Sequence, residues 1–322
     1  MTTTIWPWLP VEIIEVIIYK TWSLPLSAKD RETFIASSTI VNKAWAAAFV
    51  KISLKDVHIP SAQYAQQYLR ILRNESPVYA EYSQLLPDLL CSSLSFTLDT
   101  RSSPVGQRSM FIRPFGDYED LGVVLSNTLY AIDTLSYLPN LRRVSIEYTN
   151  WGMNDLFDNF RLSSFPTQVT TLEIKFKATS GKSDVIKQYH AHTGRVPWSL
   201  PSITHLFIGG AREEFLADMV AACPNLQTLD IESMPRLNLL EWLPYTVHTV
   251  ILRIASNVTR RGYIKALVGA LMAGWPSPPP SQKPQVILEW GEVEKSTWMW
   301  LQKIAENRGV QLAHHHDKNT LY

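Results

Sequence analysis

Residues 224–231, Pro-Asn-Leu-Gln-Thr-Leu-Asp-Ile, carry the pattern that decides the fold. A proline is followed by three apolar residues, which are spaced three and then two positions apart. Each copy of the pattern ends with apolar residues at alternate positions, which is typical of a β-strand with one buried face. Further copies follow Pro139, Pro166, Pro201 and Pro244, with a weaker one after Pro284. Such a repeat predicts structural units that stack and bury their apolar faces against their neighbours.

Segments with a helical spacing of apolar residues separate these strands. They are residues 120–137, 212–223, 260–273 and 294–307. Alternating strands and helices favour parallel strands that are joined by right-handed crossovers. The sequence therefore predicts an α/β fold, in which residues 53–312 form an irregular solenoid with a parallel sheet and residues 313–322 form a polar tail.

The strand pattern also predicts which side chains face away from the helices, since neighbouring residues of a strand point to opposite faces. If Val144 and Ile146 point inward, the residues between and beside them point outward, and the same parity applies to the other copies. The candidate substrate-binding residues on this outward face are Arg143, Glu147, Glu173, Lys175, His205, Phe207, Asp230, Glu232 and Arg253. Such a face either docks a substrate protein or small ligand, or is simply the solvated side of the sheet.

The first 52 residues are expected to form a separate helical domain. Apolar residues recur at helical spacing from Ile13 to Trp22, and a second stripe runs without a break from Phe34 to Phe49. So small a bundle cannot bury all its large apolar side chains. We therefore expect some of them to be exposed and to anchor another protein. The candidate anchors are Leu9, Pro10, Ile13, Ile17 and Trp45.

The composition argues against several classes of protein. The 322 residues include 30 Lys and Arg against 29 Asp and Glu, whereas a dedicated nucleic-acid binder needs clustered positive charge. Two cysteines, Cys91 and Cys223, are too few for a disulfide framework. Glu12 and Glu15 interrupt the apolar N-terminal stretch, so we expect no secretory signal. We also expect no membrane partner and a cytoplasmic or nuclear location.

Candidates for chemistry are few. Residues 176–183 follow a predicted strand, and their sequence nearly matches the pattern of a phosphate-binding loop. However, Phe176 occupies the position at which that loop requires glycine. The histidines at residues 314–316 are adjacent in the chain, so they cannot all reach one metal ion in good geometry. We therefore expect no catalytic residues, no bound metal and no cofactor.

Two parts of the chain resemble known families. Leu9-Pro10-Val-Glu12-Ile13, followed by Val41-Asn42-Lys43-Ala44-Trp45, resembles an F-box over residues 6–52, in the looser form of fungal F-box-like proteins. The repeats resemble leucine-rich repeats over residues 85–293, although the family's Asn or Cys after the last leucine is absent. An F-box followed by leucine-rich repeats is a known order of domains.

The resemblance implies a substrate-recognition subunit of a Skp–cullin–F-box ubiquitin ligase, which itself does no chemistry. Its N-terminal helices would bind a Skp-type adaptor, and through it a cullin, while the solenoid would bind a substrate protein that the sequence does not identify. The adaptor-binding residues that the resemblance implies are Leu9, Pro10, Glu12, Ile13, Ile17, Val41 and Trp45.

Two alternatives stay open. In the first, the protein is an interaction protein outside any ligase, and its helical domain caps the first repeat because solenoid ends need closing. In the second, a pocket around His205 and Asp230 holds a small molecule or an enzymatic site. That second alternative requires a deep, mostly apolar cavity with convergent polar groups.

Overall fold

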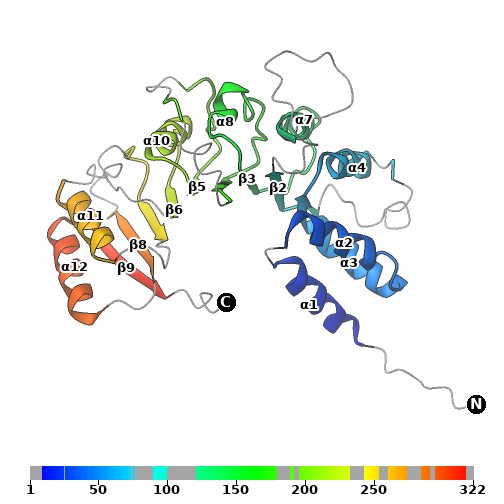
Figure 1. Cartoon of the computed structure of the whole chain (residues 1–322), viewed down its shortest axis with the longest axis horizontal. Coiled ribbons are helices and arrows are strands. Elements are labelled where there is room, and N and C mark those ends of the chain that lie inside the picture. The colour runs from blue at the N-terminus through cyan, green and yellow to red at the C-terminus, as the bar shows by residue number, and fades with distance from the viewer. Residues whose placement is uncertain are drawn as a thin grey trace, which may run out of the picture. The chain divides into compact units, whose positions relative to one another are not determined.

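The chain folds as a mixed α/β protein with two compact units, Met1–Arg142 and Arg143–Tyr322, and Figure 1 labels their elements. The structure is a computed structural model. It describes residues 9–24, 26–73, 75–76, 90–99, 121–179, 189–191, 196–232, 243–253, 260–273, 284–290 and 294–316. Parts of three expectations lie outside these residues. They include residues 6–8 of the F-box resemblance, residues 85–89 of the leucine-rich-repeat resemblance, and residues 180–183 of the segment compared with a phosphate-binding loop.

The first unit begins with three helices and continues with alternating strands and helices. Its described elements are α1 (Val11–Trp22), α2 (Ala28–Ser38), α3 (Lys43–Lys55), β1 (Asp56–Ile59), α4 (Ala62–Leu72), β2 (Ser93–Asp99) and α7 (Leu121–Thr134). The strands β1 and β2 pair in parallel, with Val57 opposite Leu94. The first three helices of this unit lie where a helical domain was expected, except that α3 continues to Lys55, beyond the expected end at residue 52.

Trp22 is the centre of the helical core in the first unit. Its ring meets the ring of Phe49 edge to face, with 5.5 Å between the centroids, and its Nε1 donates to the Asp56 carbonyl oxygen at 2.7 Å. Ile14 and Ile18 extend this buried face of α1, which packs against α3. Fully burying a large apolar side chain contributes about 1.5–3 kcal/mol. The helices are thus fixed to one another and to the start of β1.

The unbroken helical stripe that we expected from Phe34 onward is wrong, because the chain turns between α2 and α3. The Thr39 hydroxyl donates to a carbonyl oxygen of the preceding turn, a bond that competes with the helix. Asn42 then caps the new helix, since its Oδ1 accepts a hydrogen bond from the Trp45 amide at 2.8 Å. Val41 therefore lies in the turn and not on a helix.

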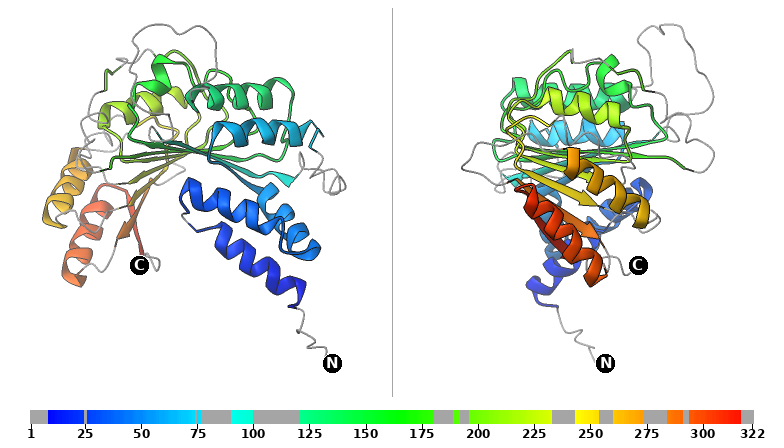
Figure 2. Two further views of the ribbon diagram at one scale, coloured as in Figure 1. Left: turned by 45° about the vertical axis from the view of Figure 1, so that its right-hand side comes forward. Right: turned by 90° about the vertical axis from the view of Figure 1, so that its left-hand side faces the viewer.

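The second unit is a row of parallel strands that pair in chain order, as Figures 1 and 2 show. Its described strands are β3 (Arg143–Thr149), β4 (Thr171–Lys177), β5 (His205–Gly209), β6 (Thr228–Glu232), β7 (Thr249–Arg253), β8 (Gln285–Trp290) and β9 (Gln311–His316). Its described helices are α8 (Asp155–Asp158), α10 (Glu213–Ala222), α11 (Arg260–Ala273) and α12 (Lys295–Asn307). The predicted α/β architecture with parallel strands is confirmed.

The repeated apolar residues stack in register across these strands. One buried row runs through Leu172, Leu206, Leu229, Val250 and Val286. A second row, two residues further along each strand, is buried in the same way. The repeating proline belongs to the turn before a strand, where the amide of Val169 donates to the Pro166 carbonyl oxygen. Each copy thus supplies one turn and one strand to a shared core.

The end of the second unit differs from the expected tail of residues 313–322, because β9 includes residues 313–316. These residues pair with β8, and the amide of Gln311 donates to the Pro284 carbonyl oxygen at 2.8 Å. Residues 317–322 of the expected tail lie outside the described residues. In the part of the chain that the structure describes, no helix has the length and apolar character that a bilayer crossing needs.

Candidate functional site

The first candidate surface is the side of α1 that does not pack against α3. We call it the outer α1 face, and its residues are Leu9, Ile13, Val16 and Ile17. Their exposed fractions are 55%, 45%, 54% and 40%, respectively. The buried residues Ile14, Ile18 and Trp22 occupy the opposite side of the same helix. Apolar side chains therefore lie on two sides of α1, and those on the outer α1 face are left in contact with water.

Six of the seven residues that the F-box resemblance implies for adaptor binding are exposed. They are Leu9, Pro10, Glu12, Ile13, Ile17 and Val41. The expectation that Trp45 is an exposed anchor is wrong, because its half-buried ring packs against the core cluster around Trp22. Within the described residues the Trp45 Nε1 has no hydrogen-bond partner. Trp45 therefore supports the bundle and offers at most part of its surface to a partner.

Several further exposed apolar residues were missing from the sequence-based set, namely Val11, Val16, Tyr19, Leu24 and Ile40. Val16 lies one helical turn beyond Ile13, and this spacing alone could have revealed it. Ile40, which is 82% exposed, lies in the turn between α2 and α3 beside Val41. It was missed because the two helices were expected to be continuous.

The second candidate surface is the outward face of the strands in the second unit. Ion pairs join its charged side chains across neighbouring strands, and two arginines each bind a diagonally placed carboxylate through two nitrogens. Arg143 donates from Nε and Nη2 to the Glu173 carboxylate, at 2.7 Å for both bonds. Arg253 donates to the Asp230 carboxylate at 2.7 and 2.9 Å and lies 3.2 Å from Glu289.

The arginines also set the protonation of this face. Burial by itself raises the pKa of Glu173, but the hydrogen bonds and charge of Arg143 and the charge of Lys175 outweigh it. The pKa of Glu173 therefore lies below its usual value. The hydrogen bonds from Arg253 to Asp230 raise the pKa of Arg253 above its usual range. The Glu173 carboxylate and the Arg253 guanidinium are consequently both charged near neutral pH.

Phe207 lies in the middle of this surface between two cations. The Lys175 Nζ is 4.8 Å from the centroid of the Phe207 ring, and the Arg253 guanidinium carbon is 5.4 Å from it. Gly209 leaves the necessary room, since a Cβ there would lie 3.1 Å from Phe207 Cε1 and 2.9 Å from Glu232 Oε2. Each cation over an aromatic face contributes about 0.5–1 kcal/mol at an exposed site.

Strand parity placed Phe207 and Asp230 on the outward face, and the expectation that their side chains are exposed there is wrong. Phe207 is 5% exposed, Asp230 is 2% exposed, and Gly209 is buried. All three lie on a strand in the expected register. They are covered because Arg253 and its neighbours fold their long side chains along the face. The remaining candidates, Arg143, Glu147, Glu173, Lys175, His205, Glu232 and Arg253, stay partly or fully exposed.

A small-molecule or enzymatic site around His205 and Asp230 would require a cavity with several convergent polar groups, and the structure brings few of them together there. His205 Nε2 is 4.0 Å from the Asp230 carboxylate, which Arg253 already binds. The described residues form cavities at two other places, between α12 and β9 (about 550 Å³) and between α2 and α4 (about 220 Å³). Among the described side chains, no group of three His, Cys, Asp or Glu residues is arranged to hold a metal ion.

Comparison of the chain with models of known protein families gives no match, and comparison with curated proteins gives none either.

Proposed function

We propose that this protein is the substrate-recognition subunit of a Skp–cullin–F-box ubiquitin ligase. The outer α1 face would bind a Skp-type adaptor, and the outward face of the second unit would bind a substrate protein. The chain would catalyse nothing itself and would act in the cytoplasm or nucleus. Its contribution would be a high effective concentration of substrate beside the ubiquitin-charged enzyme.

The observation that supports this proposal most strongly is the exposure of the outer α1 face. About half of each of its four side chains remains in contact with water. Docking that buries the rest contributes roughly 1 kcal/mol for each side chain, or about 4 kcal/mol in all. That energy corresponds to about a thousandfold in the dissociation constant. It suits a specific protein interface whose centre is apolar.

The surrounding core favours adaptor binding because it holds α1 rigidly. Arg31, which is buried, donates from Nη1 and Nη2 to the carbonyl oxygens of Trp22 and Leu24, at 2.9 Å each. Its guanidinium also lies 5.0 Å from the centroid of the Trp22 ring. These bonds satisfy carbonyl groups at the end of α1. The outer face therefore needs little ordering when a partner binds, which favours affinity.

Co-expression with a Skp-type adaptor, followed by size-exclusion chromatography, tests this proposal. We expect the wild-type chain to co-elute with the adaptor, and the double variant Ile13→Glu, Ile17→Glu to elute alone because two charges occupy the apolar face. Leu24→Glu is the matched control, since Leu24 is equally exposed but lies beyond α1. Elution of the wild-type chain without the adaptor would contradict the proposal.

One observation favours a second candidate, an interaction protein whose helical domain caps the first repeat. The bond from Trp22 Nε1 to the Asp56 carbonyl oxygen joins the helices directly to β1, as a cap requires. Capping alone gives no reason for the apolar residues on the outer α1 face, since these do not pack against β1. The co-elution experiment distinguishes the two candidates, because a simple cap does not bind the adaptor.

A further inference from the structure

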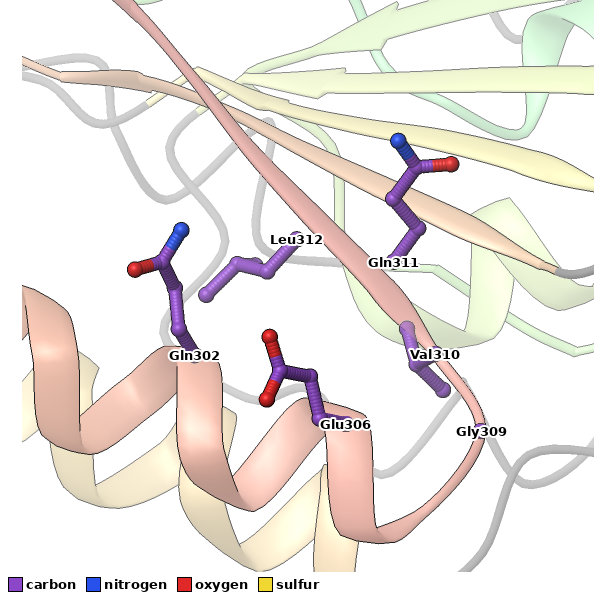
Figure 3. Close-up of a pocket in the computed structure, with 6 residues that line it drawn as sticks. All are labelled: Gln302, Glu306, Gly309, Val310, Gln311 and Leu312. Atoms are coloured by element: carbon purple, nitrogen blue, oxygen red, sulfur yellow. The ribbon is translucent and has the colours of Figure 1, made fainter.

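The part of the outward face that covers β6 to β9 lies away from the helices of the second unit. The described helices α10, α11 and α12 all lie on the other side of these strands (Figure 1). Figure 3 shows the same division at β9, where Leu312 reaches toward α12 while Gln311 points to the opposite side of the strand. The residues that alternate with the buried ones therefore share the face away from these helices.

This part of the face consists of cross-strand rows that stay in register from strand to strand. One row is polar and consists of Thr228, Thr249, Gln285 and Gln311. The next is apolar and consists of Ile251, Ile287 and Ala313, all of which are partly exposed. The third carries ionisable side chains and consists of Glu232, Arg253, Glu289 and His315. An exposed apolar row thus lies directly beside a row of charges.

The spacing of the apolar row favours a helix over an extended segment as the bound element. Neighbouring strands lie about 4.8 Å apart, so the row spans about 10 Å over its three strands. Helical residues at i, i+4 and i+7 also span about 10 Å, because each residue rises about 1.5 Å. Three alternate residues of an extended segment span about 13 Å and fall out of step with the strands. A helix that lies across the strands therefore places one apolar residue over each residue of the row.

The charges beside the apolar row favour a basic partner. The carboxylates of Asp230, Glu232 and Glu289 surround one guanidinium, that of Arg253. Among the described residues, Glu232 forms no ion pair of its own. Lys175 lies over the Phe207 ring, two strands away from Glu232. A surplus of negative charge therefore remains beside the apolar row, and it is complementary to a positively charged segment.

We propose that the outward face over β6 to β9 binds an amphipathic helix of the substrate protein. Its apolar stripe would lie on Ile251, Ile287 and Ala313. Glu232 and Glu289 are two strands apart, so they match two basic residues of that helix at positions seven apart, and an acidic residue between these faces Arg253. This inference rests on the proposed function, for which it names the class of substrate.

Fluorescence anisotropy of a labelled synthetic peptide with the purified full chain tests the charge pattern. The helical peptide of about 18 residues carries leucines at i, i+4 and i+7, a lysine directly after the first and last leucine, and a glutamate directly after the middle one. We expect saturable binding to the wild-type chain, and binding at least about tenfold weaker to Glu232→Lys, which places like charges opposite each other.

A charge exchange tests whether this loss reflects a direct contact. In two further peptides, one lysine each is replaced by glutamate. One of the two should regain the affinity for Glu232→Lys, because only one of the lysines faces position 232. Glu306→Lys is the matched control, since Glu306 lines the groove between α12 and β9 on the other side of the sheet, and it should bind the original peptide as the wild-type chain does.

Two further changes test the apolar row and the helical form of the ligand. Ile287→Ser should weaken binding at least about fivefold, with circular dichroism confirming that the variant is folded. A peptide of the same composition with a central proline cannot form the helix and should not bind.

Absence of binding by the wild-type chain would overturn the inference, as would equal binding of the proline peptide or failure of both exchanged peptides to regain affinity. The assay contains no adaptor. Failure here together with successful co-elution would therefore remove only the substrate class and leave the proposed function in place.

Discussion

At the scale of single residues, the outward face of the second unit shows what strand parity can and cannot predict. Parity placed Phe207 and Asp230 on the correct face, and the register confirms that placement. It could not predict their burial, which depends on how the long side chain of Arg253 in β7 lies across the face toward β6 and β5. Exposure on a sheet is thus set by pairs of side chains on neighbouring strands.

The adjacent glycines of β5 and its turn illustrate a backbone constraint. Gly210 has a φ of +68°, and a Cβ there would lie 2.1 Å from the Phe176 carbonyl oxygen. We expect Gly210→Ala to lower the free energy of unfolding by at least about 2 kcal/mol, since a backbone atom cannot move aside cheaply. Urea denaturation followed by circular dichroism measures the change.

Gly269→Ala is the matched control for that change. Gly269 lies in α11, and a Cβ there meets nothing within 4 Å. Alanine stabilises an exposed helix position by about 0.5–1 kcal/mol relative to glycine. Equal destabilisation by both substitutions would contradict the role assigned to the turn at Gly210.

At the scale of the strand, the pair of Glu173 and Arg143 predicts a pH dependence. Since the folded pKa of Glu173 lies below the value of 4.5 that is usual for a glutamate, this carboxylate stabilises the fold above pH 4.5. The contribution is lost as the pH falls through the lowered folded value. We therefore expect the wild-type chain to exceed Glu173→Gln in unfolding free energy at pH 7, and the difference to shrink below pH 4.5.

Urea denaturation of both proteins at pH 7 and at pH 3 measures this difference. Arg143→Gln serves as the control. Without this arginine the largest cause that lowers the pKa of Glu173 is absent, so the contribution of Glu173 to the unfolding free energy should depend less on pH. A difference between wild type and Glu173→Gln that stays the same at both pH values would show that the ion pair does not stabilise the folded state.

The secondary structure elements were predictable where one pattern repeats. Each copy of the pattern, with its proline and its alternating apolar residues, corresponds to one strand of the second unit. The prolines of these copies are Pro139, Pro166, Pro201, Pro224 and Pro244. The break between α2 and α3 was not predictable from apolar spacing, because the stripe continues across it. It depends instead on local bonds of Thr39 and Asn42, which apolar periodicity does not report.

At the scale of the whole molecule, the two candidate surfaces belong to different compact units. The outer α1 face is part of Met1–Arg142, and the outward strand face is part of Arg143–Tyr322. A recognition subunit needs two surfaces of this kind, one for the ligase and one for the substrate. The sequence predicted the apolar excess near the N-terminus, but the helix side that remains unfilled depends on which side α3 covers.

The account depends most on the claim that a Skp-type adaptor buries the outer α1 face. Calorimetric titration of the full chain with purified adaptor, at several temperatures, measures this directly. We expect binding with a negative heat-capacity change, the signature of apolar burial, and at least about a hundredfold weaker binding by Ile13→Glu, Ile17→Glu. No binding by the wild-type chain, or equal binding by that variant, would contradict the claim.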